Sequence, residues 1–147
     1  MKLAYNLGIW IYGWAVRVAA PFHRKARLWV DGRKGWEKKL ARSLGDCEEW
    51  VWMHCSSLGE FEQGRPLIEA IKQRYPQQKI LLSFFSPSGY EIRKNYVHAD
   101  HVCYLPLDTV RNARTFLDIV RPKLIVYVKY DLWLNYIAEA EARKIHQ

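Results

Sequence analysis

The sequence predicts an α/β domain in which a parallel, Rossmann-like sheet carries helices on both faces. Three observations support this fold class. Four short apolar segments are typical of buried strands, at residues 50–54, 80–84, 102–105 and 124–128. Amphipathic segments follow them, at residues 60–74, 89–96, 110–120 and 132–144. The connections are short and rich in proline, serine and glycine, and strands that alternate with helices in this way form βαβ units with a parallel sheet.

The basic charge of the chain is concentrated at its N-terminus. The formal net charge is +8, and residues 1–45 contain ten lysines and arginines against two acids. Residues 46–147 carry equal numbers of basic and acidic side chains. We therefore expect two parts, a basic membrane-associated segment at 1–45 and an α/β domain at 46–147.

Residues 3–16 form an uncharged apolar stretch that predicts an amphipathic helix. Its fourteen residues are fewer than the roughly 20 that span a bilayer. Helical spacing places two sets of residues on opposite faces: Lys2, Asn6, Gly13 and Arg17 on one, and Ala4, Ile11, Ala15 and Val18 on the other. This pattern favours a helix lying in the membrane interface. A buried core helix is the plain alternative, and a cleaved signal peptide is disfavoured by Arg17, which precedes the small residues Ala19 and Ala20.

Pro21 is expected to end this helix, and residues 22–42 form a basic segment without strong periodicity. Its cations are interleaved with Trp29 and Trp36, which suits an anionic phospholipid surface. No recognised nucleic-acid-binding fold accompanies the basic residues, so we expect no nucleic-acid partner.

The turn after the first predicted strand contains a candidate catalytic carboxylate, Glu60. Ser57 and Glu60 have the spacing of a capping box, in which both side chains serve only to close the helix start. The same turn lies where ligands bind in open α/β sheets, at the carboxyl end of a strand and beside a helix N-terminus. The spacing leaves both roles open for Glu60.

Two later turns lie at the same predicted edge. Ser88 and Glu91 have the spacing of a second capping box, and the turn that contains Gly89 could also hold an anion. Asp108 is expected to be the N-cap of the third helix. No GxGxxG sequence and no P-loop is present, so neither common nucleotide-binding motif is indicated.

The cysteines and histidines do not indicate a metal or a disulfide. Cys47, Cys55 and Cys103 are odd in number and form no CxxC pair. His98 and His101 lack further ligands at metal spacing. We expect reduced cysteines, no metal and no cofactor.

Taken in order, these turns resemble one family, the 3-deoxy-D-manno-octulosonic acid (Kdo) transferases of Gram-negative bacteria. The residues that carry the resemblance are Ser57, Gly59 and Glu60 with Pro66-Leu67, Tyr75-Pro76, Gly89 with Glu91, Tyr104-Leu105-Pro106-Leu107-Asp108, Arg121-Pro122, and Asp131-Leu132-Trp133 with Asn135. The apolar, basic N-terminus also resembles the family, in which this part seats the enzyme on the inner membrane.

The resemblance implies the N-terminal half of a two-domain glycosyltransferase of the GT-B type, which works without a metal. Such an enzyme transfers Kdo from CMP-Kdo to the lipid A precursor at the cytoplasmic face of the inner membrane. Glu60 would be the general base. The acceptor would be bound by Ser57, Gly59, Ser88, Gly89, Asp131, Trp133 and Asn135.

The sequence departs from the family at three points. Lys129 and Leu134 stand where the family usually has an acid and a proline, and Asp131 is a shortened version of a second acid.

The donor-binding domain would begin after Gln147, so we expect this chain alone to be inactive. A non-catalytic module that binds lipid A remains an alternative, as does a membrane-anchored flavodoxin-like regulatory domain, although the latter should have more acids clustered at its strand ends.

Overall fold

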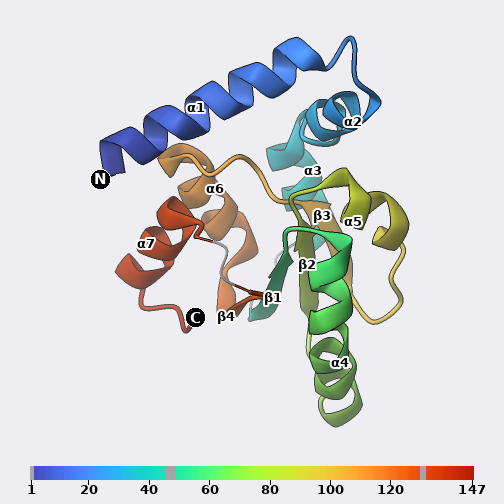
Figure 1. Cartoon of the computed structure of the whole chain (residues 1–147). Coiled ribbons are helices and arrows are strands. Elements are labelled where there is room, and N and C mark those ends of the chain that lie inside the picture. The colour runs from blue at the N-terminus through green and yellow to red at the C-terminus, as the bar shows by residue number, and fades with distance from the viewer. Residues whose placement is uncertain (1, 46–48, 130–131) are drawn as a thin grey trace.

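The computed structural model, which describes residues 2–45, 49–129 and 132–147, contains a four-stranded parallel sheet (Figure 1). The strand order is β3-β2-β1-β4. The bounds are Trp50–Cys55 for β1, Ile80–Phe84 for β2, His101–Tyr104 for β3 and Pro122–Tyr127 for β4. Each predicted strand is present within two residues of its expected bounds. The predicted parallel α/β fold is therefore confirmed.

Helices cover both faces of this sheet. The bounds are Lys2–Ala19 for α1, Arg24–Gly32 for α2, Trp36–Leu44 for α3, Leu58–Arg74 for α4, Pro87–Arg93 for α5, Val110–Val120 for α6 and Leu134–Ala142 for α7. Alternate residues of each central strand point to opposite faces. Val51 and Met53 pack in a cluster with Phe61 and Ile68 of α4. Trp50 and Trp52 of the same strand pack with residues of α3, α6 and α7.

Helix α1 lies across the carboxyl ends of the strands (Figure 1). The Tyr12 ring packs against Phe85, directly after β2, with ring centroids 5.9 Å apart. A Cβ on Gly13 would come within 2.6 Å of Leu107, so the missing side chain lets α1 approach the loop after β3. No helix among the described residues is both long and apolar enough to cross a membrane.

Residues 22–42, where the sequence showed no strong periodicity, contain α2 and most of α3. In α3, Trp36, Leu40 and Leu44 recur every four residues and bury one face of the helix. Lys38, Lys39 and Arg42 lie between these residues and are exposed. Because of these cations, the apolar repeat is hard to recognise in the sequence. The basic segment is thus packed against the sheet through an apolar stripe.

Candidate active site

Turns after neighbouring strands meet at the carboxyl edge of the sheet. The Ser86 N–H, after β2, donates a hydrogen bond to the Ser56 carbonyl, after β1, over 2.8 Å. On the other side of β1, the Val128 N–H donates to the His54 carbonyl over 3.0 Å. The candidate residues that follow β1, β2 and β4 are therefore brought to one edge, as the parallel topology requires.

Glu60 lies in the first turn of α4 with its carboxylate folded back toward the end of β1. Ser57 is the N-cap, and its Oγ lies 3.5 Å from the Glu60 backbone nitrogen and 3.4 Å from Glu60 Oε1. Glu60 Oε2 accepts a hydrogen bond from the Ser56 N–H over 2.5 Å. In a capping box the glutamate carboxylate accepts the backbone N–H of the N-cap residue, which is Ser57 here. The Glu60 carboxylate instead accepts the N–H of Ser56, one residue before the N-cap. This bond and the helix dipole both favour the ionised carboxylate.

His54 was not singled out in the sequence, although it lies only two residues before Ser56 of this turn. It is completely buried in β1. Its Nδ1 lies 2.8 Å from Ser83 Oγ, which in turn accepts from Trp52 Nε1 over 2.7 Å. Its Nε2 lies 3.3 Å from Ser56 Oγ. Burial lowers the pKa of His54 to about 3, so the ring is neutral and links the core to the turn that holds Glu60.

The turn after β2 is capped differently from the expectation. Ser86, not Ser88, is the N-cap of α5, and its Oγ accepts from the Ser88 N–H over 3.3 Å. Pro87 explains the shift, since proline favours the first turn of a helix and so fixes the start one residue after Ser86. Glu91 therefore closes no capping box, and it accepts from the Tyr104 hydroxyl over 3.2 Å.

Ser88 and Gly89 both lie in this turn. Ser88 is half-buried and its Oγ lies 2.9 Å from Ser86 Oγ. Gly89 is buried, and a Cβ there would come within 2.3 Å of the Phe84 ring. Gly89 thus permits close packing of α5 on β2, and its predicted role in substrate binding stays a prediction.

Asp108 is not the N-cap of α6, contrary to expectation. Thr109 takes that position, with its Oγ1 accepting from the Asn112 N–H. Asp108 is buried and accepts from the Asn135 and Tyr136 N–H groups, each over 3.2 Å, at the start of α7. It therefore caps a helix distant in sequence, which no local motif could reveal. Burial raises the pKa of Asp108, and the hydrogen bonds oppose this increase.

Of the predicted residues after β4, Trp133 and Asn135 are described, and Asp131 lies outside the described residues. The Trp133 ring packs on Phe85 and edge-on against His54, with centroid separations of 4.8 and 5.0 Å. Asn135 Nδ2 donates to the Asp108 carbonyl over 2.7 Å and to Asn6 Oδ1 over 2.9 Å. Trp133 thus lies beside the turn region of β1, and the Asn135 amide group joins α7 to α1.

Between α1 and the strand ends lies an aromatic cavity of about 260 Å³. It is lined by Tyr5, Ile9, Tyr12, Phe85, Leu132 and Trp133. Aromatic faces of this kind suit the apolar parts of a sugar or an acyl chain. Among the described residues, no group of three or more His, Cys, Asp or Glu side chains could hold a metal ion.

The four-stranded parallel sheet with helices on both faces places this domain in the Rossmann-like class, and its carboxyl edge, where ligands bind in such folds, has a carboxylate and an aromatic cavity. The sequence profile of one family matches residues 28–147, and its description is 3-deoxy-D-manno-octulosonic-acid transferase (kdotransferase). The chain belongs to this family, whose N-terminal domain is of the GT-B type.

Curated relatives agree with this assignment. A 3-deoxy-D-manno-octulosonic acid transferase of Haemophilus influenzae is 31% identical over 96 residues, which are 65% of this chain and 22% of that protein. The corresponding protein of Aquifex aeolicus is 31% identical over 104 residues, 70% of this chain and 29% of the relative. A bifunctional glycosyltransferase/methyltransferase of Fusobacterium nucleatum is 32% identical over 111 residues, 72% of this chain and 17% of the relative. The chain thus spans less than a third of the length of these relatives.

Proposed function

We propose that this chain is the acceptor-binding portion of a transferase that moves Kdo from CMP-Kdo to a lipid A precursor in lipopolysaccharide biosynthesis. The family assignment supports Kdo transfer in general. The observation that carries the proposal is the placement of Glu60, a carboxylate held at a helix N-terminus on the same edge of the sheet as an aromatic cavity. A donor domain beyond this chain would supply CMP-Kdo.

In the proposed reaction, Glu60 is the general base. Its carboxylate takes the proton from a sugar hydroxyl of the acceptor as that oxygen attacks the anomeric carbon of Kdo. The bond from the anomeric carbon to the phosphate oxygen breaks, and CMP leaves with the bonding electrons. The Ser56 N–H fixes one carboxylate oxygen of Glu60, which limits the orientations of the base.

Ser57, Gly59, Ser88, Gly89, Asp131, Trp133 and Asn135 are proposed to bind the acceptor. Trp133 is 9% exposed and lines the aromatic cavity, and we propose that a sugar ring packs on this exposed part of the side chain. Gly59 is exposed on the first turn of α4, one residue before the proposed base, which leaves space for a substrate.

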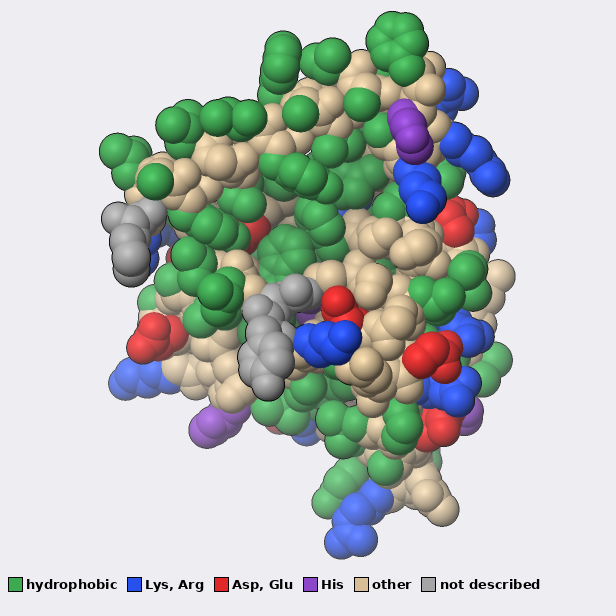
Figure 2. Space-filling model, in the orientation of Figure 1, with side chains coloured by type: hydrophobic (Ala, Val, Ile, Leu, Met, Phe, Trp, Pro, Cys, Tyr) green, Lys and Arg blue, Asp and Glu red, His purple; other side chains and the backbone are tan. Residues whose placement is uncertain are grey.

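We further propose that α1 places this site on the cytoplasmic face of the inner membrane. Figure 2 shows a row of hydrophobic side chains along α1 on the side away from the rest of the domain. Six apolar side chains of α1 are each at least 50% exposed: Leu3, Leu7, Trp10, Ile11, Trp14 and Val18. Phe22, three residues after the helix ends, is also exposed. An apolar row of this length, next to a basic segment, is typical of helices that lie in an anionic membrane surface.

The test is Kdo transfer by a completed enzyme. Residues 1–147 are joined to the part of the Aquifex aeolicus relative that follows its matched segment, with the unaltered relative as a positive control. We expect Glu60→Gln to lower the transfer rate by about 10²–10⁴-fold. The melting temperature should not change, because glutamine can still accept the Ser56 N–H. Near-normal transfer by this variant would mean that Glu60 only caps the helix and is not the base. Asp131 would then be the candidate base. A folded chimera that binds acceptor vesicles but transfers no Kdo would favour a non-catalytic binding module.

A further inference from the structure

A second cavity lies between the end of α1, helix α2 and the loop after β3. Its volume is about 390 Å³, and its lining residues include Arg17, Trp29, Arg33, Lys34, Trp36 and Asn112. It shares no lining residue with the aromatic cavity beside Trp133. No aspartate or glutamate is among the residues that line it. A cavity lined by three cations and no carboxylate is suited to an anion.

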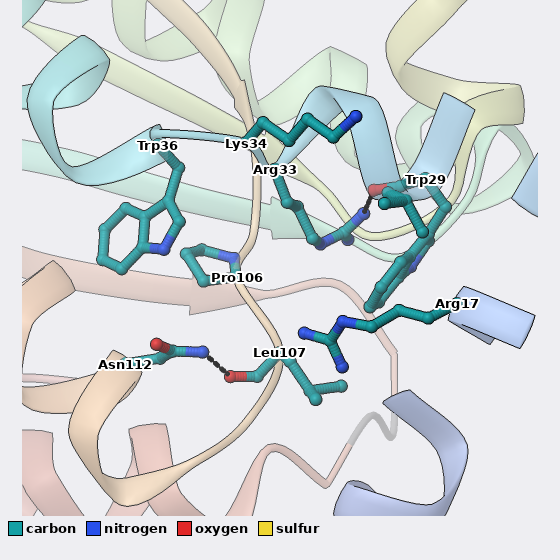
Figure 3. Close-up of a pocket in the computed structure, with 9 residues that line it drawn as sticks. Arg17, Trp29, Arg33, Lys34, Trp36, Pro106, Leu107 and Asn112 are labelled. Atoms are coloured by element: carbon teal, nitrogen blue, oxygen red, sulfur yellow. Dashed lines mark hydrogen bonds between the residues drawn. The ribbon is translucent and has the colours of Figure 1, made fainter. Parts of the chain in front are cut away.

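Two guanidinium groups approach the same space in this cavity. In Figure 3, Arg17 extends from the end of α1 into the gap between Trp29 and Leu107, and Arg33 extends from the end of α2 toward the same gap. Among the described residues, no carboxylate lies within 4.0 Å of either guanidinium group. Lys34 points away from this gap and pairs with Asp31 over 2.7 Å. The two arginines therefore supply positive charge that the described part of the chain does not neutralise.

Arg33 is held in a fixed orientation. Its Nε, Nη1 and Nη2 donate to the carbonyl oxygens of Leu105, Trp29 and Phe85 over 2.9, 3.0 and 2.8 Å. Its guanidinium carbon lies 4.0 Å from the centroid of the Trp29 ring. Three of the five N–H groups of the guanidinium are used in this way, and two are left for a further acceptor.

Trp29 supplies another donor. The side chain lines the cavity and is 5% exposed, and its buried Nε1–H has no hydrogen-bond partner among the described residues. A buried donor without an acceptor is costly, and a bound oxygen atom would remove that cost. This observation is independent of the arginines and also indicates an oxygen-rich ligand.

The position of Arg17 links the cavity to the apolar row of α1. Arg17 is seven residues, or two helical turns, after Trp10, which is 62% exposed in that row. Arg17 also follows buried Gly13 by four residues, about one helical turn, so it lies at the boundary between the apolar side of α1 and the side that packs on the domain. In a helix that rests in a bilayer surface, this boundary is at the depth of the lipid headgroups.

We propose that this cavity binds the phosphate of a membrane lipid headgroup, with Arg17 and Arg33 as the charged ligands and Trp29 Nε1 as a neutral donor. The site is separate from the proposed transfer site and does not require Kdo transfer. It would fix α1 at the membrane surface through one specific lipid contact, in addition to the general attraction of the basic segment.

The test is a titration of the 147-residue chain, observed through the indole N–H resonances of 15N-labelled protein. The probes are dihexanoyl phosphatidic acid below its micellar concentration, dihexanoyl phosphatidylcholine and inorganic phosphate. We expect phosphatidic acid to shift the Trp29 resonance, assigned with Trp29→Phe, in a saturable manner. Arg17→Gln should weaken this binding by about tenfold or more, because a charge-assisted contact is lost. Arg24→Gln is the charge-matched control outside the cavity and should change it less than about twofold.

Several outcomes would overturn the proposal. A Trp29 resonance that does not move with phosphatidic acid would exclude the site. Equal weakening by Arg17→Gln and Arg24→Gln would show general charge attraction instead of a defined site. Inorganic phosphate that binds as tightly as phosphatidic acid would identify a free anion, not a lipid, as the ligand. Equal binding of phosphatidylcholine, whose phosphate charge is offset by the choline cation, would contradict recognition of an anionic headgroup by the two arginines.

Discussion

The Tyr5 hydroxyl donates a hydrogen bond to Asp108 Oδ2 over 2.5 Å, across 103 positions of the sequence. The same carboxylate accepts the N–H groups of Asn135 and Tyr136 at the start of α7. One buried acid thus connects α1 to the α/β domain. This contact holds α1 against the carboxyl edge of the sheet, where the candidate site lies.

Removal of this contact should destabilise the protein and release α1. We expect Tyr5→Phe to lower the free energy of unfolding by about 1–3 kcal/mol, because a buried, charge-assisted hydrogen bond is lost. Denaturant titration measures this change, and limited proteolysis should cut α1 faster. Tyr12→Phe is the matched control on the same helix, since its hydroxyl makes no hydrogen bond with another described residue. An equal loss for both variants would contradict a special role for the Tyr5 hydroxyl.

The order of strands and helices could be predicted because each is specified by local sequence. Residues 80–84, which are apolar except for Ser83, form a strand with the predicted bounds, and α6 begins and ends at the predicted residues Val110 and Val120. Ser57 was also predicted as a cap, because a capping box is a motif of four adjacent residues.

The features that were missed depend on contacts between distant segments. Asp108 resembles an N-cap in sequence, but its partners Tyr5 and Tyr136 come from α1 and α7. His54 and Ser83 face each other only because β1 and β2 are paired in register. A sequence pattern contains no information about which of several apolar strands will be neighbours, so these pairs could not be derived.

Buried His54 should make stability depend on pH. Burial lowers its pKa in the folded protein to about 3, whereas an unfolded histidine has a pKa of about 6.5. Between these values the unfolded state binds the extra proton, so the free energy of unfolding decreases as the pH falls through this range. We expect His54→Gln to reduce this decrease by up to about 1.4 kcal/mol per pH unit.

Denaturant titrations at several pH values between these two pKa values measure this slope. His98→Gln, at an exposed position, is the control and should keep the slope of the unaltered chain. A slope that His54→Gln leaves unchanged would mean that His54 takes up a proton in the folded protein.

The apolar row of α1 should determine binding to bilayers. Leu7 and Trp14 are exposed in the fold, so their replacement should not affect stability. We expect the double variant Leu7→Gln, Trp14→Gln to bind anionic vesicles at least about a hundredfold more weakly, because each side chain contributes roughly 1.5–3 kcal/mol when it is buried. Co-sedimentation with vesicles measures this effect.

The matched control is Ile92→Gln, Val97→Gln, which removes two exposed apolar side chains outside α1. Binding of the unaltered chain should also weaken as salt rises from about 0.1 M to about 1 M, because the basic residues are screened. If the control variant weakens binding as much as the α1 variant, the membrane-facing role of α1 is wrong.

The two glycines predicted to contact the acceptor should respond differently to alanine. A Cβ on Gly89 would lie 2.3 Å from the Phe84 ring, so Gly89→Ala should lower the free energy of unfolding by about 1–3 kcal/mol. A Cβ on Gly59 would have Ser57 Oγ as its nearest neighbour, at 4.0 Å, and alanine favours helices by up to about 1 kcal/mol over glycine. Gly59→Ala should therefore leave stability unchanged or increase it.

Gly59→Ala consequently separates substrate contact from folding. If the acceptor approaches the backbone beside Glu60, the added methyl group should lower Kdo transfer by the completed chimera at least about tenfold, because a clash with bound substrate costs more than about 1.4 kcal/mol. Melting temperature and transfer rate are measured on the same preparation. A stable Gly59→Ala protein with normal transfer would show that the acceptor does not come close to Gly59, and the binding surface would then have to lie nearer Trp133 and the aromatic cavity.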